Sequence, residues 1–379
     1  MNQVVVTGIS IQSCLGNTHN TWENILQKKS GITIAQPFEH LPPLSLGLIT
    51  KNKPQITSHL TKELIIDLWS DSSIDTANDD IGVVIGSSRG CQSQWEQFLA
   101  IGDAITKELE FTLPWLETLP FEPAKIVAHF VNCRGAVMSP ANACATGLVS
   151  VIQGYELIKR SLCSQVVVGA VETPVTPLTI VGFKNMKALA QNRCDPFGDD
   201  RDGLVLGEGG AMLLLETKES ALARGAKIYG EITGWGLNCD ANRMTAPSST
   251  GETSIKAIKN ALAMGDIAPE KIDFIHAHGT GTTLNDRLEA KIINQLFPHS
   301  PWVASTKAYT GHTLGASGAI AIALNFLALD QQKLFPHLNY SENKLNVNLS
   351  PDDRDYPLRN MLCFSFGFGG QNAVVAIKS

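Results

Sequence analysis

The sequence has few charged residues and no excess of positive charge. Asp, Glu, Lys and Arg make up 17% of its 379 residues, whereas about 25% is typical of soluble domains. The 30 Lys and Arg stand against 36 Asp and Glu, which gives a net charge of −6. A mildly acidic chain has no electrostatic basis for binding nucleic acid or an anionic membrane surface. The scarcity of charge and the 44% hydrophobic content exclude disorder and indicate sheets that are covered on both faces by helices.

The sequence also lacks the segments that direct a chain to or across a membrane. The N-terminus enters a β-like run at once, without the charged region, apolar region and cleavage site of a signal peptide. The longest uncharged apolar stretch, Thr313 to Leu329, is shorter than the roughly 20 residues that span a bilayer. We therefore expect a buried core helix there, no membrane span, and a cytoplasmic protein.

No Cys-x-x-Cys pair occurs, and no cysteine lies at a zinc-ligand spacing from a pair of histidines. We expect reduced thiols, most of them buried fillers of the core. The cysteines are Cys14, Cys91, Cys133, Cys144, Cys163, Cys194, Cys239 and Cys363.

Short β-branched runs recur along the chain, each followed by turn residues and then by helical periodicity. This alternation predicts an α/β fold with parallel sheets and crossover connections. Residues 143–147 lead from a loop into a helix with an apolar face, and residues 310–315 lead in the same way into the apolar stretch described above. We therefore expect a duplicated chain, with an N-terminal half at residues 1–225 and a C-terminal half at residues 226–379. The predicted strands are Gln3–Thr7, Ile81–Ile85, Gln165–Val168, Ala211–Leu215, Ile228–Ile232, Phe274–Ala277 and Ala373–Ile377.

Cys144 stands directly before the first of these helices, between Ala143 and Ala145. A single cysteine is more often an inert core residue than a nucleophile. Here the small neighbours leave space above the sulfur, and the N–H groups at a helix N-terminus favour the thiolate. We interpret Cys144 as a nucleophile that takes up an acyl group as a thioester.

Two histidines and a lysine lie in glycine-containing segments of the second half. His278 begins HGTGT, and Lys307 and His312 lie in STKAYTGHTLG. Glycines beside both histidines let a ligand approach closely, and Lys307 could orient or polarise one imidazole. His276 and His278 also form a His-x-His pair on one face of a strand, which suggests a metal. No carboxylate or third ligand lies at a usual spacing, so we expect no metal site.

The C-terminal segment FSFGFGGQN has no basic residue and does not open a helix, which disfavours a phosphate-binding loop. A turn that offers a backbone N–H, with Phe368 as a movable wall beside the thiol, fits the segment better.

Together these motifs resemble those of the β-ketoacyl-acyl carrier protein synthases, condensing enzymes of the Cys-His-His type. NACATG contains Cys144, HGTGTTLND contains His278, STKAYTGHTLGASG contains Lys307 and His312, and FGFGGQN contains Phe368. The similarity covers nearly the whole chain in the family's order. It implies a thiolase-like α/β fold, in which two duplicated halves form a five-layered αβαβα body with the active site where they meet.

The resemblance also implies a role for each of these residues. Cys144 would accept an acyl chain from acyl carrier protein or coenzyme A, and His278 and His312 would assist decarboxylation of the malonyl group. The N–H groups of Cys144 and Phe368 would form the oxyanion hole. Lys307 would hold or tune His278.

The implied substrates are carried on the phosphopantetheine of acyl carrier protein, so no separate cofactor is expected. Thr280, Thr282 and Thr245 would hydrogen-bond this arm. Acyl carrier proteins are acidic, and docking one to an acidic chain requires local positive charge. Lys184 and Lys187, three residues apart and on one face if helical, are the best candidates. We expect a homodimer, or a heterodimer with a second ketosynthase-like subunit.

The chain departs from the family pattern at several positions. Ala321 stands where Glu is usual, and His276 stands where Asn or Glu is common. The stretch between Gly86 and Cys144 is shortened, in the region that shapes the dimer surface and the acyl pocket. Because Ala321 has no carboxylate, other residues must supply the polar surroundings of Lys307.

Several related activities compete with this interpretation. A biosynthetic thiolase would need a second cysteine in residues 366–372, which contain none, and His312 disfavours a starter enzyme of the Cys-His-Asn type. A chain-length-factor-like partner subunit, with little activity of its own, typically lacks the nucleophile, whereas Cys144 is present. We therefore expect a condensing acyltransferase of fatty acid or polyketide-type biosynthesis.

Overall fold

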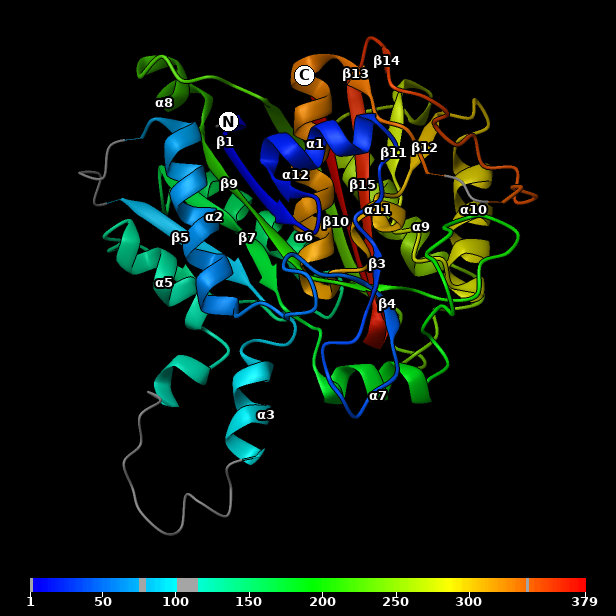
Figure 1. Cartoon of the computed structure of the whole chain (residues 1–379). Coiled ribbons are helices and arrows are strands. Elements are labelled where there is room, and N and C mark those ends of the chain that lie inside the picture. Colours follow the sequence, from blue (N-terminus) through cyan, green and yellow to red (C-terminus); the bar gives the residue numbers. More distant parts are fainter. Residues whose placement is uncertain (1–2, 75–79, 101–114, 339–340) are drawn as a thin grey trace.

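The computed structural model describes residues 3–74, 80–100, 115–338 and 341–379 (Figure 1). Its main sheet contains two groups of strands that repeat one arrangement. The first group has the order β1-β9-β7-β5-β6 and the second the order β10-β16-β15-β11-β12. The first consists of β1 (Val4–Ser13), β9 (Gly209–Thr217), β7 (Gln165–Glu172), β5 (Ile81–Gly86) and β6 (Val137–Met138). The second consists of β10 (Gly230–Cys239), β16 (Gln371–Lys378), β15 (Asn360–Gly367), β11 (Phe274–His276) and β12 (Trp302–Ala304).

The strand directions repeat as well. In each group the second strand is antiparallel to both the first and the third, and the last two strands are parallel to the third. A short antiparallel ladder between β1 and β10 joins the groups into one sheet. This repeat confirms the predicted duplication. The division at residues 225 and 226 falls between α8 (Lys218–Ala223) and β10, and that boundary stays a prediction.

Every predicted strand overlaps a strand, but the expected parallel pairing holds only for β7, β5 and β6 and for β15, β11 and β12. The strands β1, β9, β10 and β16 run antiparallel to their neighbours. The connection of β15 to β16 shows the reason, because η4 (Phe368–Gly370) supplies only three residues. A parallel pair needs a crossover of a dozen residues or more.

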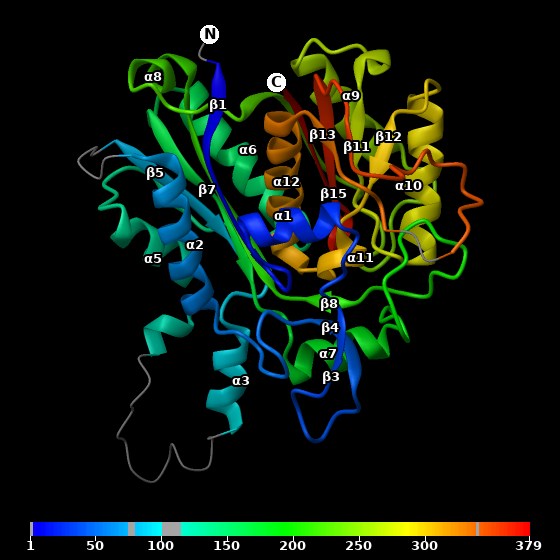
Figure 2. The ribbon, with the colours of Figure 1, turned by 45° about the horizontal axis from the view of Figure 1, so that its top comes forward.

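Helices form three layers around the two groups of strands (Figure 2). The helices α2 (Thr57–Ser72) and α5 (Glu122–Phe130) cover the outer face of the first group. The helices α6 (Thr146–Lys159) and α12 (Ser317–Gln331) lie between the groups, and α9 (Glu252–Met264) and α10 (Thr283–Leu296) cover the second group. The molecule therefore has the five-layered αβαβα arrangement of the thiolase-like fold.

The central pair of helices is packed closely. A Cβ on Gly147 of α6 would lie 2.4 Å from the backbone nitrogen of Ala319 in α12, so only glycine fits at this crossing. The segment Leu314–Gln331 is long and apolar enough to cross a membrane, but 89% of it is buried in this core. The prediction of a buried core helix is confirmed.

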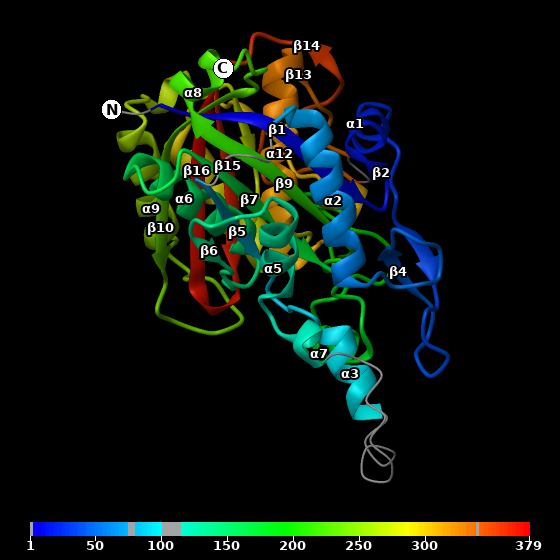
Figure 3. The ribbon, with the colours of Figure 1, turned by 90° about the vertical axis from the view of Figure 1, so that its left-hand side faces the viewer.

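Other short elements complete the fold. Helices α7 and α3 lie at the end opposite to the two chain termini (Figures 1 and 3). These elements are α1 (Thr18–Leu26), β2 (Gly16–Asn17), β3 (Thr33–Ala35), β4 (Leu44–Gly47), α3 (Gln92–Ala100), η1 (Trp115–Thr118), α7 (Pro177–Asn185), β8 (Leu206–Gly207), η2 (Pro269–Lys271), α11 (Lys307–Thr310), η3 (Leu314–Ala316), β13 (Lys333–Leu334) and β14 (Arg354–Asp355).

Candidate active site

Cys144 lies just before α6, where the N-terminal ends of α6 and α12 meet. Ala145 is the N-cap of α6, and Ala143 has a left-handed backbone with φ 48°. The Ser365 hydroxyl donates to the Cys144 carbonyl (2.8 Å), which ties the nucleophile loop to β15 of the other half. The thiol is buried and accepts a hydrogen bond from the backbone N–H of Phe368. Cys144 and Phe368 thus come together as the sequence predicts.

Burial of Cys144 opposes the thiolate that a helix N-terminus is expected to favour. Burial raises the pKa of the thiol to about 11, which outweighs the Lys307 ammonium and the Phe368 N–H. Glu172 raises this pKa further. The resting cysteine is therefore a thiol, and it must lose its proton as it reacts.

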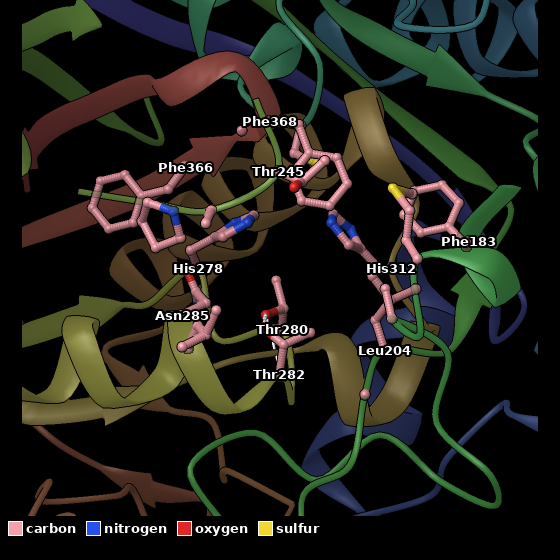
Figure 4. A pocket seen from close by; sticks show the side chains of 18 of the residues that line it. Phe183, Leu204, Thr245, His278, Thr280, Thr282, Asn285, His312, Phe366 and Phe368 are labelled. Carbon is pink, nitrogen blue, oxygen red and sulfur yellow. Dashed lines mark hydrogen bonds between the residues drawn. The ribbon is translucent and has the colours of Figure 1, made fainter. Parts of the chain in front are cut away.

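His278 and His312 lie beside this thiol. The Cys144 sulfur and one nitrogen of each imidazole all lie within 4.8 Å of one another. The two rings have centroids 5.5 Å apart and stand nearly perpendicular, at 79° (Figure 4). His312 Nδ1 is 2.8 Å from the Ser317 hydroxyl, whereas His278 Nδ1 has no hydrogen-bond partner among the described residues.

Both histidines are neutral. Burial lowers the pKa of each imidazole well below its ordinary value, and the Lys307 ammonium lowers it further. A neutral imidazole keeps one nitrogen free to accept a proton or a metal and can donate through the other. Each histidine of the pair can therefore either accept a proton from a bound substrate or donate a hydrogen bond to it.

Lys307 extends from α11 to the main chain of His278. Its Nζ donates to the His278 carbonyl, and the side chain is buried. Burial lowers the pKa of this amine, while the Glu289 carboxylate raises it. The sequence placed Lys307 next to His278, and the contact is with the backbone of that residue.

Two buried carboxylates hold the loop that carries His278. Glu289 accepts hydrogen bonds from the N–H groups of His278 and Gly279, and Asp286 accepts from those of Thr280 and Gly281. Burial raises the pKa of Glu289 to about 7 and also raises that of Asp286. The HGTG backbone is therefore fixed from α10.

Glu172 holds the segment that follows His312, and the sequence interpretation missed it. Its carboxylate accepts from the Gly315 N–H (3.0 Å) and from hydroxyl and N–H groups of residues 87–89. It thereby joins a loop of the first half to the histidine segment of the second. A carboxylate that ends the eight-residue buried strand β7 is the signal that could have identified it.

A cavity of about 280 Å³ leads from the surface to Cys144 and both histidines. Thr245, Thr280 and Thr282 line it, and the hydroxyls of Thr280 and Thr282 are 2.8 Å apart (Figure 4). Phe368 also lines it, and its ring stacks on that of Phe183 with centroids 6.0 Å apart. All three predicted threonines therefore face one cavity.

The two predicted docking lysines do not share a helix face. Lys184 lies in the last turn of α7, but Lys187 follows the helix with a left-handed backbone, φ 54°. The Lys187 and Ala188 N–H groups bond to the Lys184 and Phe183 carbonyls and end the helix. Both lysines are exposed, and Lys187 lines the cavity.

The His-x-His pair does not form one site. His276 points into the core, where its nitrogens bond to Asn325 and Thr306, while His278 faces the cavity. In the part of the chain that the structure describes, the group suited to hold a metal is Cys144, His278 and His312.

The chain matches two family models, the beta-ketoacyl synthase N-terminal domain over residues 49–221 and the beta-ketoacyl synthase C-terminal domain over residues 229–341. It is 32% identical over 411 residues to 3-oxoacyl-[acyl-carrier-protein] synthase 2 of Staphylococcus aureus (strain COL), covering 99% of this chain and 98% of that protein. The synthase of the same name from Mycobacterium bovis is 32% identical over 409 residues, covering 98% and 96%.

Solved structures with the same fold include ketosynthases of polyketide pathways. One, a type II PKS acyl-carrier protein in complex with its ketosynthase bound to the hexaketide, matches with a TM-score of 0.92 and 25% identity over 100% of this chain and 99% of that chain. The ishigamide ketosynthase/chain length factor matches with a TM-score of 0.90 and 25% identity over the same shares. By sequence and by fold, the chain belongs to the beta-ketoacyl synthase family.

Proposed function

We propose that this protein is a β-ketoacyl-ACP synthase, an acyltransferase that condenses an acyl thioester with malonyl-ACP by decarboxylation. The observation that carries the proposal is the meeting of one buried thiol and two neutral imidazoles at the end of a cavity open to the surface. Family membership supports the same reaction. The product serves fatty acid or polyketide-type biosynthesis.

In the first step Cys144 takes the acyl group. The sulfur attacks the thioester carbonyl, the bond to the carrier's sulfur breaks, and the carrier leaves as a thiol. Because burial keeps Cys144 protonated, its proton passes to a neighbouring imidazole as the new bond forms, and that imidazole then gives it to the departing carrier sulfur. The N–H groups of Phe368 and Cys144 stabilise the negative charge on the carbonyl oxygen.

In the second step malonyl-ACP loses carbon dioxide. His278 and His312 donate hydrogen bonds to the thioester oxygen, which carries the enolate charge. The enolate carbon attacks the Cys144 thioester, a carbon–carbon bond forms, and the bond to the Cys144 sulfur breaks. The resulting thiolate takes up a proton from water. Lys307 holds the His278 main chain and supplies positive charge next to all three groups.

The carrier delivers both substrates through the cavity. Thr245, Thr280 and Thr282 bind the phosphopantetheine arm, and Lys187 and Lys184 meet the acidic carrier at the mouth. No further cofactor takes part, and the reaction takes place in the cytoplasm. The complex of a related ketosynthase with its acyl carrier protein supports this choice of partner.

A second surface supports a dimer. Strand β6 ends the first group and pairs only with β5 in the part of the chain described. Beside it lies a groove of about 370 Å³ with exposed apolar side chains, among them Phe121, Val137 and Met138. A free sheet edge with such side chains favours pairing with another chain. We place a second copy, or a second ketosynthase-like subunit, on this edge.

The proposed reaction is tested with acyl-ACP and malonyl-ACP. We expect carbon dioxide and a carrier-bound 3-oxoacyl group two carbons longer than the acyl substrate. His278→Ala and His312→Ala should each lower condensation by about 100-fold or more, since each removes a positioned hydrogen-bonding group. Normal condensation in both variants would rule out the second step. If condensation needs a sister subunit and is unchanged by Cys144→Ala in this chain, the chain is instead a chain-length-factor-like partner.

A further inference from the structure

His276 is a buried histidine that the proposed reaction does not use. It is the last residue of β11 and is 1% exposed. Its Nδ1 lies 2.8 Å from Asn325 Oδ1, and its Nε2 lies 3.2 Å from the Thr306 hydroxyl. The Phe335 ring packs against the His276 ring, with centroids 5.3 Å apart. Both nitrogens are thus engaged within an aromatic part of the core.

The orientation of the Asn325 amide, with Oδ1 toward the ring, assigns the tautomer of His276. An amide oxygen can only accept, so Nδ1 carries the hydrogen and donates it to Asn325. Nε2 then has a free lone pair, and the Thr306 hydroxyl donates to it. Burial lowers the pKa of the ring to about 3, so this neutral form persists.

Thr306 connects this ring to Lys307. It is the N-cap of α11, and its carbonyl accepts from the N–H groups of Tyr309 (2.9 Å) and Thr310 (3.1 Å). A four-residue helix has few hydrogen bonds of its own, so its direction depends on how this cap is held. Lys307 is the first residue of α11 and reaches the His278 carbonyl.

The ammonium of Lys307 has no carboxylate to hold it directly. Among the described residues Lys307 forms no ion pair within 4.0 Å, and Ala321 is a methyl group where the family usually has Glu. Its position is therefore set by the main chain of α11 and by the acceptor at His278.

We propose that His276 is a positioning residue for Lys307. Its ring holds the Thr306 hydroxyl, which fixes the start of α11 and keeps the ammonium beside Cys144 and both histidines. The inference rests on the proposed role of Lys307. In this chain His276 and Thr306 would position the Lys307 ammonium, in place of the glutamate that is usual at position 321.

The test measures how fast iodoacetamide alkylates Cys144 as a function of pH. Only the thiolate reacts, and Lys307 lowers the pKa of this thiol, so the profile reports the position of the ammonium. The variants are His276→Phe, which keeps an aromatic ring among phenylalanines, and Thr306→Val, which removes only the hydroxyl donor. Lys307→Ala defines the full effect, and His299→Phe is the matched control. His299 is exposed and bonds the Ile272 carbonyl, away from Lys307.

We expect Lys307→Ala to shift the profile to higher pH, with an alkylation rate at neutral pH about tenfold lower for each unit of pKa. His276→Phe and Thr306→Val should each shift it in the same direction by a smaller amount. Combining the two should add nothing beyond the larger single effect, and neither should matter once Lys307 is alanine. His299→Phe should leave the profile unchanged.

The inference would be overturned if Lys307→Ala shifts the alkylation profile while both His276→Phe and Thr306→Val keep the profile of the parent. A residue with a purely structural role would lower the melting temperature and leave the profile in place, which also counts against it. If His276→Phe does not fold, Thr306→Val alone decides. If Lys307→Ala itself leaves the profile unchanged, the failure lies with the proposed role of Lys307.

Discussion

The carboxylate of Glu172 should contribute more to stability than any ordinary buried glutamate, because it is fully used as an acceptor. Its Oε1 accepts from the Ser87 hydroxyl (2.7 Å) and the Arg89 N–H (3.0 Å). Its Oε2 accepts from the Ser88 N–H (2.8 Å), the Ser88 hydroxyl (2.6 Å) and the Gly315 N–H (3.0 Å). All of these groups donate to the carboxylate. If an amide replaces it, the NH₂ group of that amide must point at one or more of these donors.

The cost of Glu172→Gln follows from this arrangement. Glutamine keeps one oxygen, and the less costly orientation places it at Oε2, where two backbone N–H groups need an acceptor. The amide NH₂ then faces the Ser87 hydroxyl, which can rotate, and the Arg89 N–H, which cannot. The Arg89 N–H, which is part-buried, is then left without a partner, at a cost of about 1–3 kcal/mol. We expect this loss in the free energy of unfolding.

Glu208→Gln is the matched control. Glu208 is also buried, and Oε1 accepts the Gln55 N–H (2.9 Å). The Ile49 N–H also acts on this carboxylate, but Oε2 has no hydrogen bond within 3.5 Å among the described residues. Glutamine can keep its oxygen at Oε1, so the change should cost less than about 1 kcal/mol. The assay is equilibrium unfolding in urea at one protein concentration, because association adds to apparent stability. Equal unfolding free energies for the two variants would refute the account of Glu172.

Three further predictions concern the carrier, the core and the dimer. Lys187→Glu should raise the KM for malonyl-ACP and weaken its salt dependence, with little change for a small thioester; equal kinetics on malonyl-ACP at low salt would remove Lys187 from the docking site. His337, whose pKa burial lowers to about 4 from 6.5, stays neutral in the fold while the unfolded chain gains a proton below 6.5. In His337→Gln, glutamine can bond the same Ser305 N–H and Pro196 carbonyl but does not titrate. From about pH 7 to about pH 5 the parent should therefore lose about 2 kcal/mol more unfolding free energy than this variant. A difference between the two proteins that does not change with pH would contradict this prediction. Val137→Lys at the edge of β6 should convert a dimer to a monomer by light scattering, and a variant that stays dimeric would move the interface elsewhere.

The residues that bear the chemistry could be predicted because each lies in a short motif with a local signal. Cys144 precedes a helix, His278 and His312 have glycine neighbours, and Phe368 lies in a glycine-rich turn. The structure brings these side chains to one cavity, although their roles stay predictions.

What could not be predicted depends on contacts between distant segments. The thiol pKa of Cys144 reflects burial by both halves, which no local motif reports. Glu172 accepts a hydrogen bond from Gly315, which lies 143 positions further along the chain. His276 bonds to Asn325 in the core and does not face the cavity. The antiparallel strands were missed because alternating strands and helices carry no information on the sense of β1 and β9.

The most direct test of the central claim is the mass of the intact protein after incubation with acyl-ACP alone, followed by peptide mapping. We expect one acyl group for each chain, attached to the peptide that contains Cys144. Cys144→Ala should show no adduct, whereas His278→Ala should still be acylated, since decarboxylation is not needed for loading. An adduct on another residue, or an unchanged level of acylation in Cys144→Ala, would contradict the account.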